Sequence, residues 1–217
     1  QRNGDEHLPA ATPFVKAGIP TFIDKPFCFS SAAAKEFLDM AKKVGTPVTS
    51  YSSIAHSYAT EDIRKQLDEI GDVNQITCYG KADINSVYGG IYFYGVHMVE
   101  PLLYYFDDRV VTARVNKNEK DNLNSTASLV FENGRMATLI ITSKKYGWQT
   151  FVETVEGVVE LKSRVEKVEP DKNYVDMVTM FSTGKEPRTH ESIIHGIAIL
   201  EALHKSVISG NWETVLA

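Results

Sequence analysis

The order of the predicted elements changes once along the chain, and this change constrains the fold more than any other feature. Between residues 8 and 81, helical and strand patterns alternate, with single elements joined by short loops. That alternation is typical of a parallel α/β sheet. Helices are predicted at 8–17, 31–44 (capped by Ser30 or Ser31) and 61–70 (capped by Thr60), and strands at 20–24, 46–53 and 73–82.

After a helix expected at 95–106, the pattern becomes that of an antiparallel sheet. Asn133-Gly134 lies between alternating apolar residues, a strong hairpin signal, and Glu156-Gly157 is a second turn of this kind. We therefore expect an α/β unit over residues 1–72. An α+β domain should follow over residues 73–217, with an open, mostly antiparallel sheet covered on one face by helices. The strands of this domain are predicted at 109–118, 125–142 and 150–163, and its last two helices at 173–184 and 190–210.

Composition excludes several classes of partner. The net charge is −5 and no basic block is present, so we expect no nucleic-acid partner. Apolar stretches fall far short of the roughly 20 residues of a membrane span, and no signal peptide is visible. Cys28 and Cys78 show no paired-cysteine motif and lie on or near strands, so we expect buried, reduced thiols and a cytoplasmic protein.

The stretch "FIDKPFCF" places Asp24, Lys25 and Pro26 directly after a buried strand. Pro26 fixes its own φ and biases Lys25 away from the α region. Ligands of open α/β sheets bind outside the carboxyl ends of the strands, so Lys25 can donate to a substrate oxygen while Asp24 orients it. The alternative is an ordinary surface ion pair between Asp24 and Lys25.

A second candidate is His97 in "YGVHMVE". If the helix begins near Gly95, His97 lies in the first turn, where the helix dipole disfavours the imidazolium form. A neutral imidazole can take a proton from a hydroxyl near pH 7. The alternative is a hydrogen-bonded histidine in an aromatic core.

Four segments carry a family resemblance. They are "AGIPTFIDKPFCFSSAAAKEFLDMAKKVGTPV", "EIGDVNQI", "GGIYFYGVHMVEPLL" and "HESIIHGIAILEALHKSVISGNWETV". In this order they resemble the Glu-Lys-Pro region, the turn into the second domain, the Gly-x-His helix and the closing helix of the Gfo/Idh/MocA oxidoreductases. The resemblance runs through almost the whole chain.

This resemblance implies hydride transfer between NAD or NADP and a hydroxyl-bearing carbon of a sugar, cyclitol or related small molecule. It implies that residues 1–72 are the C-terminal part of a Rossmann domain. A sheet with one exposed face also suits pairing with a second copy, so we expect a homo-oligomer through the open sheet. Lys25 falls on the lysine that contacts the reacting hydroxyl, and His97 on the histidine taken as general acid/base. The implied cofactor-binding residues are Asp24, Lys25 and Pro26, and the implied substrate-binding residues are Lys25, Tyr51, His56, Tyr94 and His97.

The sequence departs from the family pattern at four points. Asp24 replaces a glutamate, Phe93 stands where many members carry an aspartate that partners the histidine, and Ile54 falls about where many carry an arginine. No G-x-G-x-x-G can be built from the 14 glycines. We therefore expect a C-terminal portion of a longer enzyme, inactive alone and with an incomplete dinucleotide site.

One alternative function remains open: a non-catalytic sugar-binding or dimerisation module that keeps the family fold. No metal site is predicted. His190 and His195 lack i, i+4 spacing and are expected to face solvent on the last helix. Glu153 and Glu160 are expected on a solvated sheet face.

Overall fold

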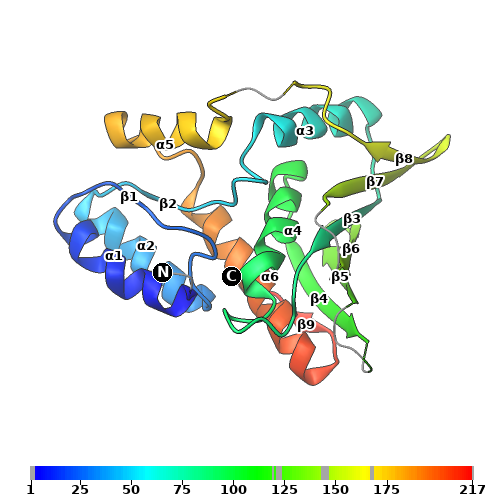
Figure 1. Ribbon diagram of the computed structural model, residues 1–217, viewed down its shortest axis with the longest axis horizontal. Helices are drawn as coiled ribbons and strands as arrows, with labels where there is room; N and C mark the ends of the chain where they lie inside the picture. Colours follow the sequence, from blue (N-terminus) through cyan, green and yellow to red (C-terminus); the bar gives the residue numbers. More distant parts are fainter. Residues whose placement is uncertain (1–2, 119, 121–123, 143–146, 167–168, 217) are drawn as a thin grey trace.

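The structure is a computed structural model that describes residues 3–118, 120, 124–142, 147–166 and 169–216. A small parallel sheet with two helices stands beside a larger mixed sheet (Figure 1). This arrangement confirms the predicted fold class. The boundary predicted between residues 72 and 73 lies in the loop that joins α3 to β3. The first elements are a 3-10 turn η1 (Gly4–Glu6), α1 (His7–Lys16), β1 (Thr21–Phe22), α2 (Ser31–Val44), β2 (Val48–Thr49) and α3 (Tyr58–Ile70).

The small sheet pairs β1 with β2 in parallel, as expected of consecutive α/β strands. α2 begins where the Ser30 hydroxyl accepts a hydrogen bond from the Ala33 amide, and ends at Gly45, whose φ of 73° is left-handed. The start predicted for α3 is wrong. Ser57, in an extended conformation, caps this helix and accepts from the Thr60 amide, so Thr60 lies inside the first turn.

The large sheet has the strand order β8-β7-β3-β6-β5-β4-β9. Its neighbours are antiparallel except β3 and β6, which run parallel. The predicted hairpins at Asn133-Gly134 and Glu156-Gly157 join β5 to β6 and β7 to β8. β3 lies in the large sheet and not beside β1 and β2, which agrees with the boundary expected at residues 72 and 73, although the helix–strand alternation up to residue 81 had grouped it with them. The strands are β3 (Gln75–Lys81), β4 (Val110–Lys117), β5 (Ser125–Phe131), β6 (Met136–Thr142), β7 (Gln149–Thr154), β8 (Gly157–Leu161) and β9 (Glu213–Thr214).

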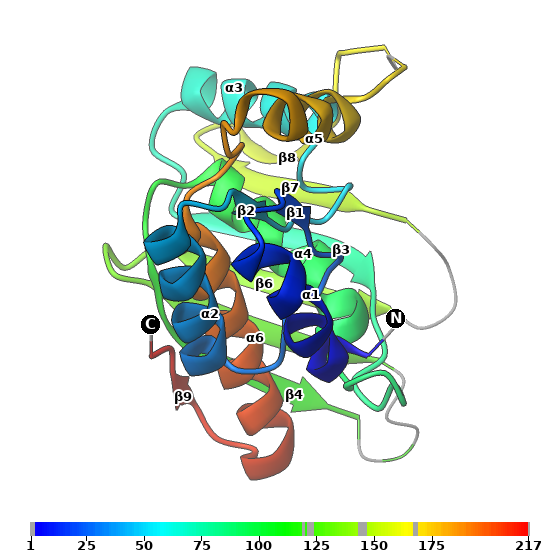
Figure 2. The ribbon, with the colours of Figure 1, turned by 90° about the vertical axis from the view of Figure 1, so that its left-hand side faces the viewer.

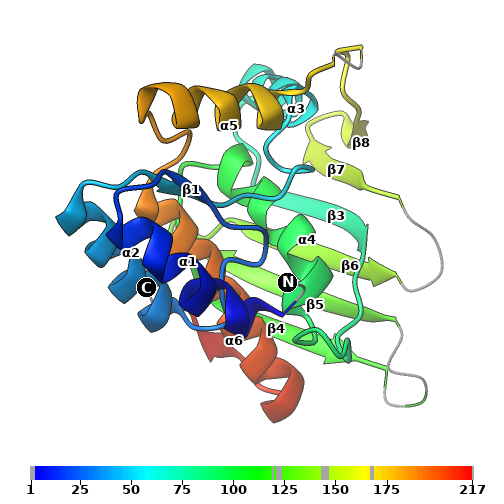
Figure 3. The same ribbon diagram turned by 60° about the vertical axis from the view of Figure 1, so that its left-hand side comes forward.

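Helices α4 (Tyr92–Tyr105) and α6 (His190–Ser209) cover one face of the large sheet, and none of the described helices covers the other face, which is here called the open face (Figures 1 and 3). α5 (Lys172–Thr183) lies beside α3 (Figure 2), and the Lys172 ammonium is 3.0 Å from a Glu61 carboxylate oxygen. No helix among the described residues is long and apolar enough to cross a bilayer.

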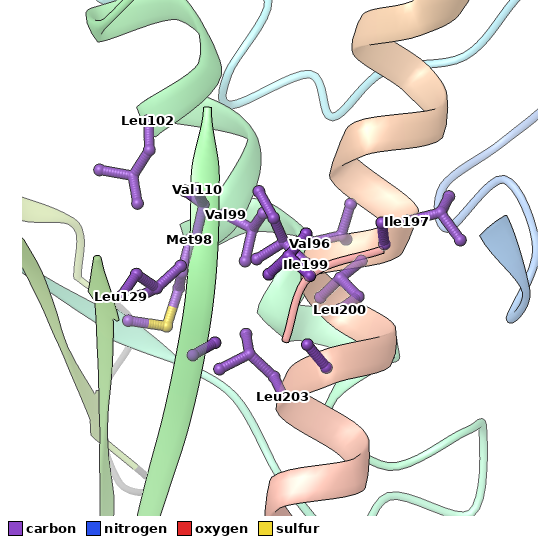
Figure 4. Close-up of a cluster of buried hydrophobic side chains, with 14 of the residues drawn as sticks. Val96, Met98, Val99, Leu102, Val110, Leu129, Ile197, Ile199, Leu200 and Leu203 are labelled. Carbon is purple, nitrogen blue, oxygen red and sulfur yellow. The ribbon is translucent and has the colours of Figure 1, made fainter. Parts of the chain in front are cut away.

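The core between α4, α6 and the sheet consists of aliphatic side chains that interlock (Figure 4). α6 buries Ile193, Ile197 and Leu200, as its predicted apolar face requires, and Val207 packs against the same core. Cys28 and Cys78 are buried free thiols, as expected. The interlocking residues are Val96, Met98, Val99, Leu102, Val110, Leu129, Ile197, Ile199, Leu200 and Leu203.

The expectation that both histidines of α6 face solvent is wrong. His195 is buried, and its Nε2 accepts a hydrogen bond from the Val110 amide at 3.1 Å. This bond ties α6 to the first residue of β4. His190 is half-buried, with its Nε2 2.9 Å from a Glu186 carboxylate oxygen.

Candidate active site

Lys25 lies just beyond the carboxyl end of β1, where the sequence predicted a ligand-binding position. Its ammonium nitrogen is 4.9 Å from the centre of the Phe93 ring and 5.4 Å from that of Tyr94. Burial lowers the pKa of Lys25, and the charges of Asp24 and Glu100 oppose that shift. Phe93, which cannot act as a carboxylate partner, instead supplies an aromatic face to the Lys25 ammonium.

A cavity of about 170 Å³ lies at Lys25 and is lined by Tyr51 and by residues of α5. The Tyr51 hydroxyl donates to the Asn173 carbonyl at 2.6 Å, so this ring meets the cavity with its hydroxyl already engaged. Asp24 also lines the cavity and is exposed, while Pro26 is buried.

The helix that carries His97 begins earlier than predicted. Ile91 already has helical φ and ψ, so α4 starts at Tyr92 and His97 lies in its second turn. The imidazole is nevertheless held neutral, because burial and the nearby charge of Lys25 lower its pKa to about 3. Burial, and not the helix dipole, therefore sets the charge state of His97.

The Nδ1 atom of His97 is 2.6 Å from the hydroxyl oxygen of Ser52, which follows β2. That oxygen also accepts hydrogen bonds from the amides of Ile54 and Ala55, at 3.2 and 3.3 Å. Because both lone pairs of the hydroxyl are used, its proton is directed at Nδ1. His97 is therefore the tautomer with its proton on Nε2, and Nε2 has no hydrogen-bond partner among the described residues.

Ser52 is held from its other side by a buried ion pair. Its amide donates to one carboxylate oxygen of Glu100, and the second carboxylate oxygen lies 2.9 Å from the Arg188 guanidinium. Arg188 also donates to the Ser50 carbonyl at 3.1 Å. Glu100 lies three residues after His97, so the same face of α4 contacts both the hydroxyl and the amide of Ser52.

His56 lies behind the cavity at Lys25. Its ring stacks on Tyr51 with 4.2 Å between centres, its Nδ1 is hydrogen-bonded to the Tyr104 hydroxyl, and its Nε2 lies 2.7 Å from Asp176. Both ring nitrogens are thus engaged, and His56 lines neither this cavity nor the one beside His97.

The structure therefore brings Lys25, Tyr94 and His97 together, with Tyr94 in contact with both of the others. The centres of the Tyr94 and His97 rings are 5.4 Å apart. Trp148, whose ring centre is 5.7 Å from that of His97, completes the aromatic surroundings. Lys25 and His97 still line separate cavities, and His97 lies at one of about 330 Å³.

Sequence reasoning missed Ser52, Glu100, Arg188 and Trp148. A signal existed for Glu100, a lone carboxylate in the apolar helix pattern and one turn from His97. The described residues hold no cluster of three or more His, Cys, Asp or Glu side chains placed to bind a metal ion.

The two buried histidines make stability depend on pH. The pKa of His97 is lowered to about 3 and that of His195 to about 4, whereas the ordinary value is 6.5. Below pH 6.5 these histidines are protonated in the unfolded chain but not in the folded chain. The stability that the two neutral histidines contribute is therefore fully present above pH 6.5 and is lost as the pH falls towards 4.

We expect the free energy of unfolding to fall by about 1.4 kcal/mol per pH unit for each histidine in this range. Urea unfolding at about pH 7 and about pH 5 measures it. His195→Gln keeps an acceptor for the Val110 amide. This variant should reduce the change in the free energy of unfolding between the two pH values by the contribution of one histidine. A pH-independent free energy of unfolding would contradict this expectation.

No protein-family model and no curated protein sequence matches the chain. Solved structures do. Scyllo-inositol dehydrogenase from Lactobacillus casei has a TM-score of 0.80 at 13% identity, covering 99% of this chain and 77% of that one. Myo-inositol dehydrogenase from the same organism, solved with NAD(H) and myo-inositol, has a TM-score of 0.80 at 11% identity, covering 99% and 76%. An oxidoreductase from Agrobacterium radiobacter, solved with NAD+, L-tartaric acid and magnesium, has a TM-score of 0.76 at 13% identity, covering 98% and 78%.

At these low sequence identities the comparison establishes the fold alone. The chain has the fold of Gfo/Idh/MocA-type oxidoreductases, as the sequence resemblance implied. Within that class, its similar structures include inositol dehydrogenases, and it spans about 77% of the length of the scyllo-inositol dehydrogenase.

Proposed function

We propose that the protein is an NAD(P)-dependent oxidoreductase that acts at a hydroxyl-bearing carbon of a sugar, cyclitol or similar small molecule. The observation that carries the proposal is that Lys25 and His97 both contact Tyr94. This contact lies beyond the carboxyl end of a parallel strand, in a fold shared with dehydrogenases. The nicotinamide would carry the hydride. In this proposal Asp24, Lys25 and Pro26 bind the nicotinamide cofactor, whereas no G-x-G-x-x-G for its pyrophosphate occurs in the 217 residues.

In this proposal Lys25 and His97 act on the same substrate oxygen. His97, neutral and protonated on Nε2, donates a hydrogen bond to it. Lys25, whose pKa is lowered by burial, gives a proton to that oxygen or takes one from it. The rings of Tyr51 and Tyr94 form walls of the proposed substrate site, and the His56 ring stacks on Tyr51. An imidazole with a pKa of about 3 is a weak base, so in this tautomer the lysine is the better proton carrier.

The proposed partner, apart from a small substrate, is a second copy of the chain. Among the described elements, no helix covers the open face of the large sheet (Figure 1). Tyr79 and Met136 are exposed there, and the Tyr79 ring is 5.5 Å from that of Phe151. Such a surface suits isologous pairing. We place the protein in the cytoplasm on account of its buried free thiols.

The test uses the full-length gene product. NADH and NADPH are titrated by fluorescence, and a panel of polyols that includes myo-inositol is then assayed for nicotinamide reduction. Saturable binding of either cofactor together with turnover of a panel member is expected. Sugar binding or self-association without any nicotinamide binding would replace this proposal with the non-catalytic module.

Ser52 provides a prediction about His97. In the wild-type chain, ¹⁵N NMR of the imidazole should show a protonated Nε2 and an unprotonated Nδ1. Ser52→Ala removes the hydroxyl that fixes this tautomer, so a mixture of tautomers is expected. Turnover should fall about 5- to 10-fold, the equivalent of one hydrogen bond.

Ser52→Thr keeps the hydroxyl and is the matched control, which should restore both the NMR signature and the turnover. The assignment fails if the wild-type spectrum shows a protonated Nδ1, or if Ser52→Ala leaves the tautomer unchanged.

A further inference from the structure

A cavity of about 330 Å³ lies beside His97, between α3, α4 and the ends of β7 and β8. Its size is that of a small-ligand pocket. The Trp148 indole, 36% exposed, forms one side of it, where Gly80 leaves room for the ring. The other apolar walls are formed by Ile54, Ile63, Met98, Pro101, Tyr105 and Leu161.

Polar groups on the walls are bonded to one another. The hydroxyls of Ser57 and Thr60 both donate to the Ile54 carbonyl, at 3.0 and 2.9 Å. At the rim, a Glu160 carboxylate oxygen lies 2.7 Å from the Lys162 ammonium. The Ser57 and Thr60 hydroxyls therefore have little hydrogen-bonding capacity left for a ligand, whereas Lys162, whose side chain is 74% exposed, keeps donors that face water.

His97 adds a donor to the wall. The Nε2–H of His97 has no acceptor among the described residues, because the Ser52 hydroxyl occupies Nδ1. Beside His97 the wall thus offers this donor and the apolar contacts of Met98 and Trp148, while Tyr79, Gln149, Thr150, Lys162 and Ser163 also line the cavity. A polyol would lose water from several hydroxyls against these apolar walls, and hydroxyls left without a partner weaken binding. An apolar ring with a single oxygen would lose little.

We propose that this cavity receives an apolar group of the substrate, of about the size of a six-membered ring, attached next to the carbon whose oxygen His97 binds. The assignment of that oxygen to His97 rests on the proposed function, whereas the apolar preference of the cavity stands on its walls. Ile54 forms part of the apolar wall, at about the position where the family resemblance places an arginine.

Cyclohexanol and myo-inositol form a matched pair of probes, since they share a six-membered carbon ring and differ by five hydroxyls. Binding to this chain is followed by tryptophan fluorescence in a Trp212→Phe background, which leaves Trp148 as the only tryptophan. Cyclohexanol should give a saturable change at millimolar concentration. Its Kd should lie at least tenfold below that of myo-inositol.

Ile54→Arg puts a charge on the cavity wall and should weaken cyclohexanol binding at least tenfold. Val87→Arg, at a residue that is 90% exposed and outside the cavity, is the matched control and should bind like the parent. Equal or tighter binding of myo-inositol, binding of neither probe, or unchanged cyclohexanol binding in Ile54→Arg would overturn the proposal. Because no nicotinamide is used, a chain that binds cyclohexanol keeps the cavity assignment even if the full-length protein shows no turnover.

Discussion

Lys25→Ala in the full-length gene product is expected to lower kcat by about 10²- to 10⁴-fold, the range of a lost general acid or base. The ammonium lies over Phe93 and Tyr94 and, in the proposed function, is the group that exchanges a proton with the substrate oxygen. Steady-state nicotinamide absorbance measures the loss. Far-UV circular dichroism should be unchanged, because the Lys25 side chain is half-buried and does not belong to the hydrophobic core.

The matched variant is Lys25→Arg, which keeps the positive charge but cannot release its proton near neutral pH. Burial lowers the pKa of Lys25 below its ordinary value of 10.5. In the direction of alcohol oxidation, wild-type turnover should therefore rise with pH and level off below pH 10.5, as Lys25 becomes neutral. Lys25→Arg should show no such rise. Wild-type turnover in Lys25→Ala would remove Lys25 from the chemistry.

Arg188→Met is expected to lower the free energy of unfolding by about 3–5 kcal/mol. The substitution leaves the Glu100 carboxylate buried without its cation, although the carboxylate still accepts the Ser52 amide. Urea denaturation measures the change.

The double variant Arg188→Met/Glu100→Gln tests the cause. Glutamine removes the uncompensated charge and keeps a carbonyl oxygen for the Ser52 amide, so much of the lost stability should return. A single-variant loss below about 1 kcal/mol would mean that this pair behaves like a surface ion pair.

Features that depend on residues close in sequence were predicted correctly. The Ser30 cap, the turn at Asn133-Gly134 and the apolar face of α6 each depend on residues close in sequence, and each was found. The start of α4 was missed because no capping side chain marks it, and the chain enters the helix at Ile91 on backbone geometry alone.

The partners of a side chain are harder to predict than its type. Lys25 and His97 could be chosen by their settings and by the family resemblance. Ser52 could not, because its contact with His97 joins residues far apart in sequence and depends on how the end of β2 meets α4. The neighbours of β3 within the large sheet could not be predicted for the same reason, since an alternating strand does not encode its neighbours.

The central place of β3 bears on how the protein reaches its structure. The β4–β5–β6 meander and the β7–β8 hairpin can each form from neighbouring segments. β3 precedes both in the chain and yet lies between them, paired with β6 on one side and β7 on the other. The two pieces become one sheet only when β3 docks, which closes two long loops. The folding rate of this domain should accordingly be limited by one non-local docking event rather than by local helix or hairpin formation.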